Sequence, residues 1–262
     1  MLKAFKYRIY PNQFQKQKFA EHFGCARFVY NWALNKKETF YKKTKKNLSK
    51  RMLQDQLVAL KKEQLWLTDV NSQTLLASLF NLDTAFTKFF KRSAKYPQFK
   101  KRYAGRQSYQ CPQHVQVNFA NNMVNLPKIK NIKAKLHREF EGKMKTCTIS
   151  RTATNNYYIS ILVENGKKEP APAYIEKEKT MGLDLGIKDF VITSSGEKEP
   201  NNKYLSKNKK HLKRIQRRLS KKEKRSANRA KARRKVAKIH EKIANQRNDR
   251  AHQVSAKLVY KS

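Results

Sequence analysis

Residues 2–10, LKAFKYRIY, alternate apolar and charged side chains. Phe5, Tyr7 and Ile9 share one face, and the lysine and arginine between them share the other. This period of two predicts a strand with one buried face. Pro11-Asn12 follows directly and predicts a turn that ends the strand. We expect the strand to join a sheet formed later in the chain.

Helical spacing follows. Apolar residues recur with a helical period from Gln13 to about Leu34, and a shorter helix is expected over Arg51–Lys62, beyond a Lys-rich stretch at 42–50. The clearest helix has one apolar stripe, formed by Leu75, Leu79, Leu82, Phe86 and Phe89. Its candidate N-caps are Asp69, Asn71 and Ser72. We interpret these stripes as the core of a small helical bundle.

The period returns to two between about Gln107 and Glu164. The apolar positions that predict strands are Val115, Val117 and Phe119, then Ile132, Ala134 and Leu136, then Tyr157, Ile159, Ile161 and Val163. Asn121-Asn122 and Asn155-Asn156 predict turns between strands. Short strands joined by turns suggest a small barrel, to which residues 2–10 could add a strand.

The last third of the chain is different. Residues 166–180, with Pro170 and Pro172, are typical of a linker. Met181–Leu185 and Phe190–Thr193 then predict a strand, a turn and a strand. Residues 203–250 hold 21 Lys or Arg against 3 acidic residues, and they predict a long basic helix or a pair of helices. A narrow apolar seam indicates that this segment packs on something, and its members are Leu212, Ile215, Leu219, Val236, Ile239 and Ile243.

The charge indicates the kind of partner. Lys and Arg outnumber Asp and Glu by 61 to 19, a formal net charge of +42 at pH 7. The surplus is spread along the chain, at 36 basic against 12 acidic residues over 1–180 and 25 against 7 over 181–262. Lys and Arg displace the counterions condensed on phosphates, so a nucleic acid is the expected partner. No apolar run of membrane length or signal-peptide stretch is found, so we expect a soluble intracellular protein that binds no membrane.

Cysteines and histidines give no metal signature. Cys25, Cys111 and Cys147 are widely separated, which predicts buried or idle thiols in a reducing compartment rather than a disulfide framework or a zinc finger. None of the six histidines has HExxH spacing. His240 and His252 are expected on the basic helix, in surface or packing roles.

One carboxylate stands out. In Gly182-Leu183-Asp184-Leu185-Gly186, the two leucines are expected to point into a core and Asp184 away from it. Sites that hydrolyse phosphodiesters with two divalent ions hold those ions with several carboxylates. Asp184 offers one such carboxylate. Asp189, Glu197 and Glu199 are not expected to join it. Asp184 could instead only shape a hairpin. The motif also occurs in actin-like and sugar-kinase ATPases, although Ile187 replaces their usual Thr or Ser.

A second pattern mixes cations with flat rings, in Phe89-Phe90-Lys91-Arg92 and in Tyr96-Pro97-Gln98-Phe99-Lys100-Lys101-Arg102-Tyr103. Bases stack on aromatic rings while Lys and Arg hold phosphates, which is how proteins grip single strands. Phe89 is assigned to the helix core from its position in the stripe. The predicted nucleic-acid contacts here are Lys91, Arg92, Lys100, Lys101 and Arg102.

Several segments together resemble the transposon-encoded OrfB/TnpB proteins, which are RNA-guided DNA endonucleases related to compact type V CRISPR effectors. The matching segments are Tyr7–Asn12, Gly24–Asn31, Asp83–Phe90, Tyr96–Lys100, Leu126–Lys128, Gly182–Phe190 and Ile239–Arg247. Their order and spacing across the chain make the resemblance specific.

The resemblance implies an α+β multidomain fold. Residues 1–12 would form the first strand of a wedge β-barrel, 13–106 an inserted helical recognition domain, 107–165 the rest of the barrel, 166–180 a linker and 181–262 a partial RNase H-like (RuvC) nuclease domain. Asp184 matches the first catalytic, Mg²⁺-binding carboxylate. Ser72 and Gln73 fall where a motif flanking the target would be read. The implied contacts to guide RNA or to its heteroduplex with target DNA are Lys213, Arg214, Arg217, Arg218, Arg233 and Arg234. The resemblance also implies a prokaryotic, cytoplasmic, nucleoid-associated protein.

This sequence also lacks several functional residues of the family. Its later Glu, its four-Cys zinc finger and its final Asp would follow Lys257–Ser262, where this sequence stops. One carboxylate cannot hold two Mg²⁺ ions, so we expect a truncated protein that holds no zinc, binds Mg²⁺ unproductively and does not cut DNA alone. A second polypeptide could supply the missing part. The alternatives are a non-enzymatic nucleic-acid-binding repressor or accessory factor and, more remotely, an actin-like ATPase.

Overall fold

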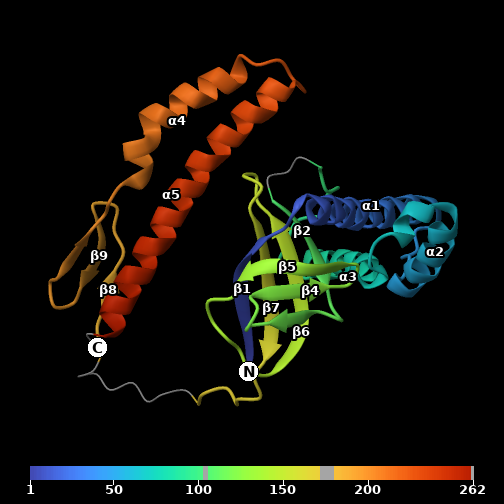
Figure 1. Cartoon of the computed structure of the whole chain (residues 1–262), viewed down its shortest axis with the longest axis horizontal. Coiled ribbons are helices and arrows are strands. Elements are labelled where there is room, and N and C mark those ends of the chain that lie inside the picture. Colours follow the sequence, from blue (N-terminus) through green and yellow to red (C-terminus); the bar gives the residue numbers. More distant parts are fainter. Residues whose placement is uncertain (103–105, 172–179, 261–262) are drawn as a thin grey trace. The chain divides into compact units, whose positions relative to one another are not determined.

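The computed structural model describes residues 1–102, 106–171 and 180–260. The chain divides into two compact units, Met1–Lys168 and Glu169–Ser262 (Figure 1). Both combine helices with antiparallel strands, so the α+β class is confirmed. Each unit is described by itself below. The expected linker at 166–180 includes residues 172–179, which lie outside the described part of the chain.

Unit 1, Met1–Lys168, contains a seven-stranded sheet in the order β2-β6-β7-β1-β5-β4-β3, and every neighbouring pair is antiparallel. The strands are β1 (Leu2–Tyr10), β2 (Gln107–Cys111), β3 (Gln116–Asn118), β4 (Met123–Leu126), β5 (Ile129–Lys135), β6 (Lys143–Arg151) and β7 (Tyr157–Glu164). The first strand is central, between β7 and β5. Phe5, Tyr7 and Ile9 are buried, which confirms the face predicted for them.

The sheet must be strongly curved. Its two outermost strands, β2 and β3, are consecutive in sequence, and residues 112–115 join them. A link of that length spans at most ~18 Å. Seven flat strands would place their outer members about 29 Å apart. Asn122 and Asn155 adopt left-handed backbone conformations in the predicted turns, with φ of 50° and 64°.

The helices of unit 1 lie between β1 and β2 in sequence. They are α1 (Gln13–Thr44), α2 (Lys50–Glu63) and α3 (Ser72–Phe90), with a 3₁₀ turn at Leu65–Thr68. One face of α1 packs on the sheet through Phe19, Phe23 and Ala26. Farther along, α1 joins α2 and α3 in a second core that contains Val29, Leu34, Leu53, Leu75 and Leu79. The bundle predicted from the stripes is therefore present.

Helix ends correct two details of the prediction. The first helix runs ten residues beyond the expected end at Leu34, because basic residues do not oppose helix formation and Lys37 reaches Asn47 and the carbonyl of Leu48. Asn71 is the N-cap of α3, and its side chain accepts from the amide of Gln73 at 3.1 Å. Ser72 is therefore the first helical residue rather than the cap.

Unit 2, Glu169–Ser262, has a three-stranded sheet in the order β10-β9-β8 and a helical hairpin. Its elements are β8 (Leu183–Asp184), β9 (Asp189–Thr193), β10 (Lys198–Pro200), α4 (Tyr204–Ser220) and α5 (Ala227–Val259). The basic segment is thus a pair of helices, and three residues of this pair are buried, namely Leu212, Ile243 and Val254. No helix in the described part of the chain is long and apolar enough to span a membrane.

The surroundings of β8 correct a prediction. Leu183 and Leu185 are 51% and 74% exposed, although both were expected in a core. Within the described residues β8 pairs only with β9, so it is an edge strand. Alternation predicts which side chains share a face, but a face is buried only where another layer covers it.

Candidate nucleic-acid interface

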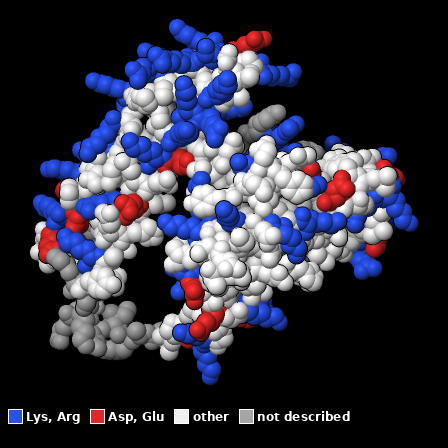
Figure 2. All heavy atoms as spheres, in the orientation of Figure 1, with Lys and Arg blue, Asp and Glu red and all other residues white. Residues whose placement is uncertain are grey.

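The α4–α5 hairpin is the most cationic structure in the chain. Helix α4 carries seven Lys or Arg and no acidic residue, and α5 carries ten against two. Figure 2 shows these side chains projecting along the hairpin with few acidic neighbours. Because like charges repel, this arrangement favours a polyanionic partner.

A groove of about 700 Å³ lies between the two helices. His211, Arg214 and Arg218 line it from α4. From α5 it is lined by Lys231, Lys235 and Lys238, which occupy one face at helical spacing. No carboxylate lines this groove, so its positive potential is not neutralised locally.

The four predicted contacts on α4 line one hollow, whereas the two predicted on α5 do not line it. A second hollow of about 420 Å³ along α4 is lined by Lys210, Lys213, Arg214, Arg217, Arg218 and Lys221. Arg233 and Arg234 line neither hollow. The three lysines of the groove were not among the contacts predicted from the sequence. The apolar seam that includes Ile239 could have identified their face by helical periodicity.

Backbone carbonyls and a serine cap fix the closed end of the hairpin. One guanidinium nitrogen of Arg229 donates to the carbonyls of Leu219 at 3.0 Å and Lys222 at 2.7 Å. The Ser226 hydroxyl accepts from the amide of the same arginine at 3.1 Å and caps α5. These bonds hold the groove-lining faces of the two helices in place.

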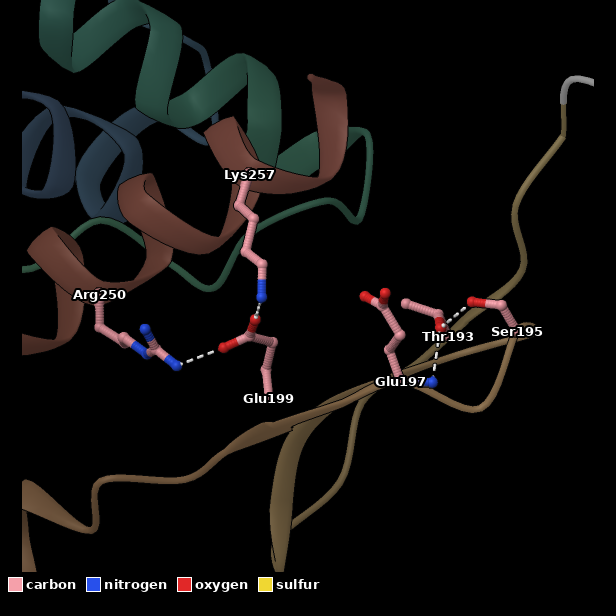
Figure 3. Close-up of polar contacts among 6 residues, drawn as sticks. All are labelled: Thr193, Ser195, Glu197, Glu199, Arg250 and Lys257. Carbon is pink, nitrogen blue, oxygen red and sulfur yellow. Dashed lines mark hydrogen bonds and ion pairs between the residues drawn. The ribbon is translucent and has the colours of Figure 1, made fainter. Parts of the chain in front are cut away.

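Glu199 joins the other end of α5 to the sheet (Figure 3). Its carboxylate accepts from Arg250 at 2.6 Å and also pairs with Lys257. The hydrogen bond from Lys257 is the main cause that lowers the pKa of Glu199. Beside it, the Thr193 hydroxyl bonds to Ser195 and accepts from the amide of Glu197, which closes the turn between β9 and β10. Glu199 therefore has a structural role in unit 2.

Asp184 lies on the edge strand β8, opposite Ile192 of β9, and it is exposed. The glycines around it fit a close hairpin, since a Cβ at Gly186 would come within 3.0 Å of the carbonyl oxygen of Asp189. Among the described residues no three Asp, Glu, His or Cys side chains gather into a metal-binding group. The residues around Asp184 thus do not fit a two-metal centre, which needs several carboxylates.

The basic and aromatic residues after α3 form an exposed cluster in unit 1. Phe90 is 73% exposed and contacts both Phe86 and Phe89. Phe89 is half-buried rather than fully in the core, and Tyr96 packs edge-on against it. Lys91 and Arg92, beyond the helix end, are exposed. Ser72 is exposed at the opposite end of α3, next to the partly buried Gln73.

Asn31 attaches the rest of this basic segment to α1. Its side chain donates to the carbonyl of Lys100 at 3.0 Å and accepts from the amide of Lys100 at 2.8 Å. Lys101 and Arg102 follow and are exposed. Tyr103, which belongs to the predicted segment, lies outside the described residues.

The outer face of the sheet carries cations and rings that the sequence analysis did not select. Arg8 of β1 donates to the Tyr158 hydroxyl at 3.0 Å, and its guanidinium lies 5.0 Å from the centre of that ring. The ammonium of Lys6 lies 4.6 Å from the centre of the same ring. The alternation of β1 identified the two cations, but their aromatic partner is known only from the strand pairing.

Two family models match the chain. Residues 1–46 match the OrfB helix-turn-helix domain of IS605-type elements, and residues 160–262 match the OrfB probable transposase of the same elements. The chain belongs to the OrfB/TnpB family. In this OrfB/TnpB protein residues 1–46 form the strand β1 and the single helix α1, rather than two helices joined by a turn.

Two relatives of the OrfB/TnpB chain share the description of a putative RNA-guided DNA endonuclease. It is 36% identical over 212 residues to a putative RNA-guided DNA endonuclease of Streptomyces pristinaespiralis, covering 79% of this chain and 52% of that protein. It is 34% identical over 211 residues to the putative RNA-guided DNA endonuclease InsQ of Escherichia coli K12, covering 79% and 51%. The chain thus spans about half the length of these two relatives. Virulence protein VsdF of Salmonella dublin is 32% identical over 114 residues, covering 39% and 96%.

Solved structures similar to the OrfB/TnpB chain are more distant. One is a Cas12f1–sgRNA–target DNA complex, with a TM-score of 0.48 and 10% identity over 98% of this chain and 78% of that one. Another is a CRISPR-Cas12f ternary complex, with a TM-score of 0.38 and 14% identity over 95% and 60%.

Proposed function

We propose that this OrfB/TnpB protein binds a guide RNA and, through it, target DNA. The observation that supports this most directly is the cationic groove between α4 and α5, which no carboxylate lines. A groove of this kind holds phosphates irrespective of sequence. Base pairing with the guide would then select the target. The names of the two endonuclease relatives agree with this function.

The proposal assigns a part to each segment. The curved sheet of unit 1, made of residues 1–12 and 107–165, would be a wedge barrel, and residues 13–106 would be the recognition domain inserted in it. Ser72 and Gln73 would read the flanking motif. Residues 181–262 would be the beginning of an RNase H-like (RuvC) domain, which lays the hairpin along RNA. The exposed rings after α3 would stack on unpaired bases.

We further propose that this chain does not cut DNA by itself. Asp184 is its one residue matched to the catalytic carboxylates, and the described residues around it offer no second ligand set. Any Mg²⁺ held there would lack the symmetric clamp that stabilises both the attacking and the leaving oxygen. A second polypeptide that supplied further carboxylates would restore cutting.

The test begins with RNA that co-purifies with the protein expressed beside its native flanking DNA. We expect sequencing to recover one defined RNA, and we expect DNA matching that RNA to bind in its presence. Recovery of random RNA, with binding to any duplex, would favour the non-enzymatic repressor or accessory factor. Guide-dependent cleavage in Mg²⁺ that Asp184→Ala abolishes would contradict the inactivity proposed for the chain alone.

A further inference from the structure

A polar pocket of about 470 Å³ lies within unit 1, where α1, α3, the segment at 98–101 and β2 meet. Its volume falls in the range of small-ligand sites, about 300–1,000 Å³. Arg27, Lys100, Lys101 and Arg106 line it, and no Asp or Glu does. Such a lining selects for an anion.

Lys100 is one of these cations, and its backbone and side chain are both positioned by neighbours. Asn31 fixes its backbone through two hydrogen bonds, and its ammonium lies 4.0 Å from the centre of the Tyr30 ring. Desolvation lowers the pKa of Lys100, and none of the charged residues described in the chain offsets this effect. Lys100 is nevertheless exposed, so a phosphate in the pocket could reach its ammonium and supply a counter-charge.

The remaining lining groups suit a flat, polar ring. Phe99 is 48% exposed and lines the pocket, whereas the Phe23 and Tyr109 rings that also line it are buried. Side-chain amides supply both donors and acceptors, and other residues hold two of them in place. Gln110 accepts from Asn81 at 3.2 Å, and Gln107 accepts from Arg151 at 2.7 Å.

Phosphate-binding cations, an accessible ring and fixed amides are together the groups that recognise a nucleotide. We propose that this pocket holds one unpaired nucleotide of a bound strand, with its phosphate at Lys100 and Arg27 and its base against Phe99. The inference rests on the proposed function, because the strand is the nucleic acid bound there. It assigns base recognition to a defined pocket, whereas the α4–α5 groove would contact the backbone.

The experiment compares the unaltered chain with two pocket variants, Phe99→Leu and Lys100→Met. Matched controls are Phe14→Leu and Lys16→Met, on the part of α1 that does not line the pocket. The probe is a short single-stranded RNA with photoreactive 4-thiouridines, and a second probe replaces some bases with abasic sites. Fluorescence anisotropy measures affinity, and mass spectrometry maps the cross-linked peptide. Thermal unfolding confirms that each variant is folded.

We expect a cross-link in the peptide that contains Phe99. Stacking of one base on an aromatic ring changes affinity by about fivefold or more. We therefore expect the abasic probe to bind the wild type at least fivefold more weakly, with little further loss in Phe99→Leu. Lys100→Met should weaken both probes, and the controls should match the wild type.

Two kinds of failure are distinguishable. If the wild type binds no oligonucleotide, the proposed function itself fails. If it binds RNA but both pocket variants behave as the controls do and the cross-link maps elsewhere, the pocket inference alone is overturned. Equal affinity of the wild type for the two probes would likewise exclude a base contact in the pocket.

Discussion

His22 shows how one buried residue joins two parts of unit 1. It is 1% exposed, its Nδ1 lies 2.7 Å from the carbonyl of Lys18, and its Nε2 accepts from the amide of Asn71 at 3.3 Å. The two bonds require a neutral ring protonated at Nδ1. Desolvation is the main cause that lowers the pKa of His22, the charges of Lys18 and Lys128 act the same way, and Glu21 opposes them.

Acid should therefore weaken unit 1 through His22. A histidine whose pKa is lower in the folded than in the unfolded state stabilises the fold fully above its ordinary value of 6.5 and loses that contribution as the pH falls below it. Gln can keep both hydrogen bonds without titrating. Between pH 7.5 and 5.5 the wild type should lose more thermal stability than His22→Gln. Equal losses, measured by circular dichroism, would exclude this role.

The cysteines are a second residue-level result. Cys111 and Cys147, far apart in sequence, are direct partners on β2 and β6, yet both are free and buried, as is Cys25. Burial is the main cause that raises the pKa of Cys25 to about 11 and that of Cys147 to about 12. Of the two expected states, buried or idle, the structure shows that all three thiols are buried.

These thiols should be almost inert in the folded protein. A pKa two units above the ordinary thiol value leaves roughly a hundredth of the usual thiolate at pH 8, and the thiolate is the reactive form. With a disulfide reagent at pH 8, we expect very slow reaction in buffer and rapid reaction of all three thiols in denaturant. Fast labelling of the native protein would show that the core around them opens readily.

At the scale of elements, the connection of α5 to the small sheet depends on Glu199. Its side chain is 12% exposed. Arg250 and Lys257, two turns apart on the same face of α5, both pair with it. Removing the carboxylate would leave the partly buried Arg250 without this partner. Such losses cost more than the pair itself contributes.

Glu199→Gln should therefore loosen the C-terminal half of α5. We expect faster amide hydrogen exchange around residues 250–257 and a lower melting temperature at neutral pH. Because the pKa of Glu199 is lowered, the wild type should keep this advantage above the ordinary value of 4.5 and lose it as the pH falls further. Glu223→Gln, at an exposed loop carboxylate in the same unit, is the matched control. Similar exchange in both variants would refute the role of Glu199.

Over the whole molecule, the net charge is expected to govern how salt affects binding to nucleic acid. With a net charge of +42, binding to nucleic acid should depend steeply on salt. If about ten phosphates are contacted, log K should fall with log salt at a slope near −9 on duplex DNA and less steeply on single strands. A weak salt dependence would mean that most of the cations face solvent in the complex.

The groove makes this prediction specific. Replacing Lys231, Lys235 and Lys238 by Gln should flatten the slope on duplex DNA by roughly two to three, since each lost phosphate contact removes about 0.9. Replacing Lys42, Lys61 and Lys62, which lie on α1 and α2, removes the same charge elsewhere. Equal slopes for the two triple variants would show that net charge, rather than the groove, governs affinity.

Local periodicity and composition were enough to predict several features of this chain. Alternation fixed the buried face of β1, steps of three and four identified the stripe of α3, and the excess of Lys and Arg identified the class of partner. The motif around Asp184 and the other matching segments were sufficient to indicate the family. Each of these signals lies within a short stretch of chain.

Contacts between residues far apart in sequence became known only from the folded chain. Folding placed β1 at the centre of its sheet, set Cys111 opposite Cys147, and brought Asn31 to Lys100. It also left the leucines beside Asp184 exposed and left Arg233 and Arg234 out of the groove lining. A local pattern defines a face, whereas strand register and the rotation of one helix against another follow from packing between segments far apart in sequence.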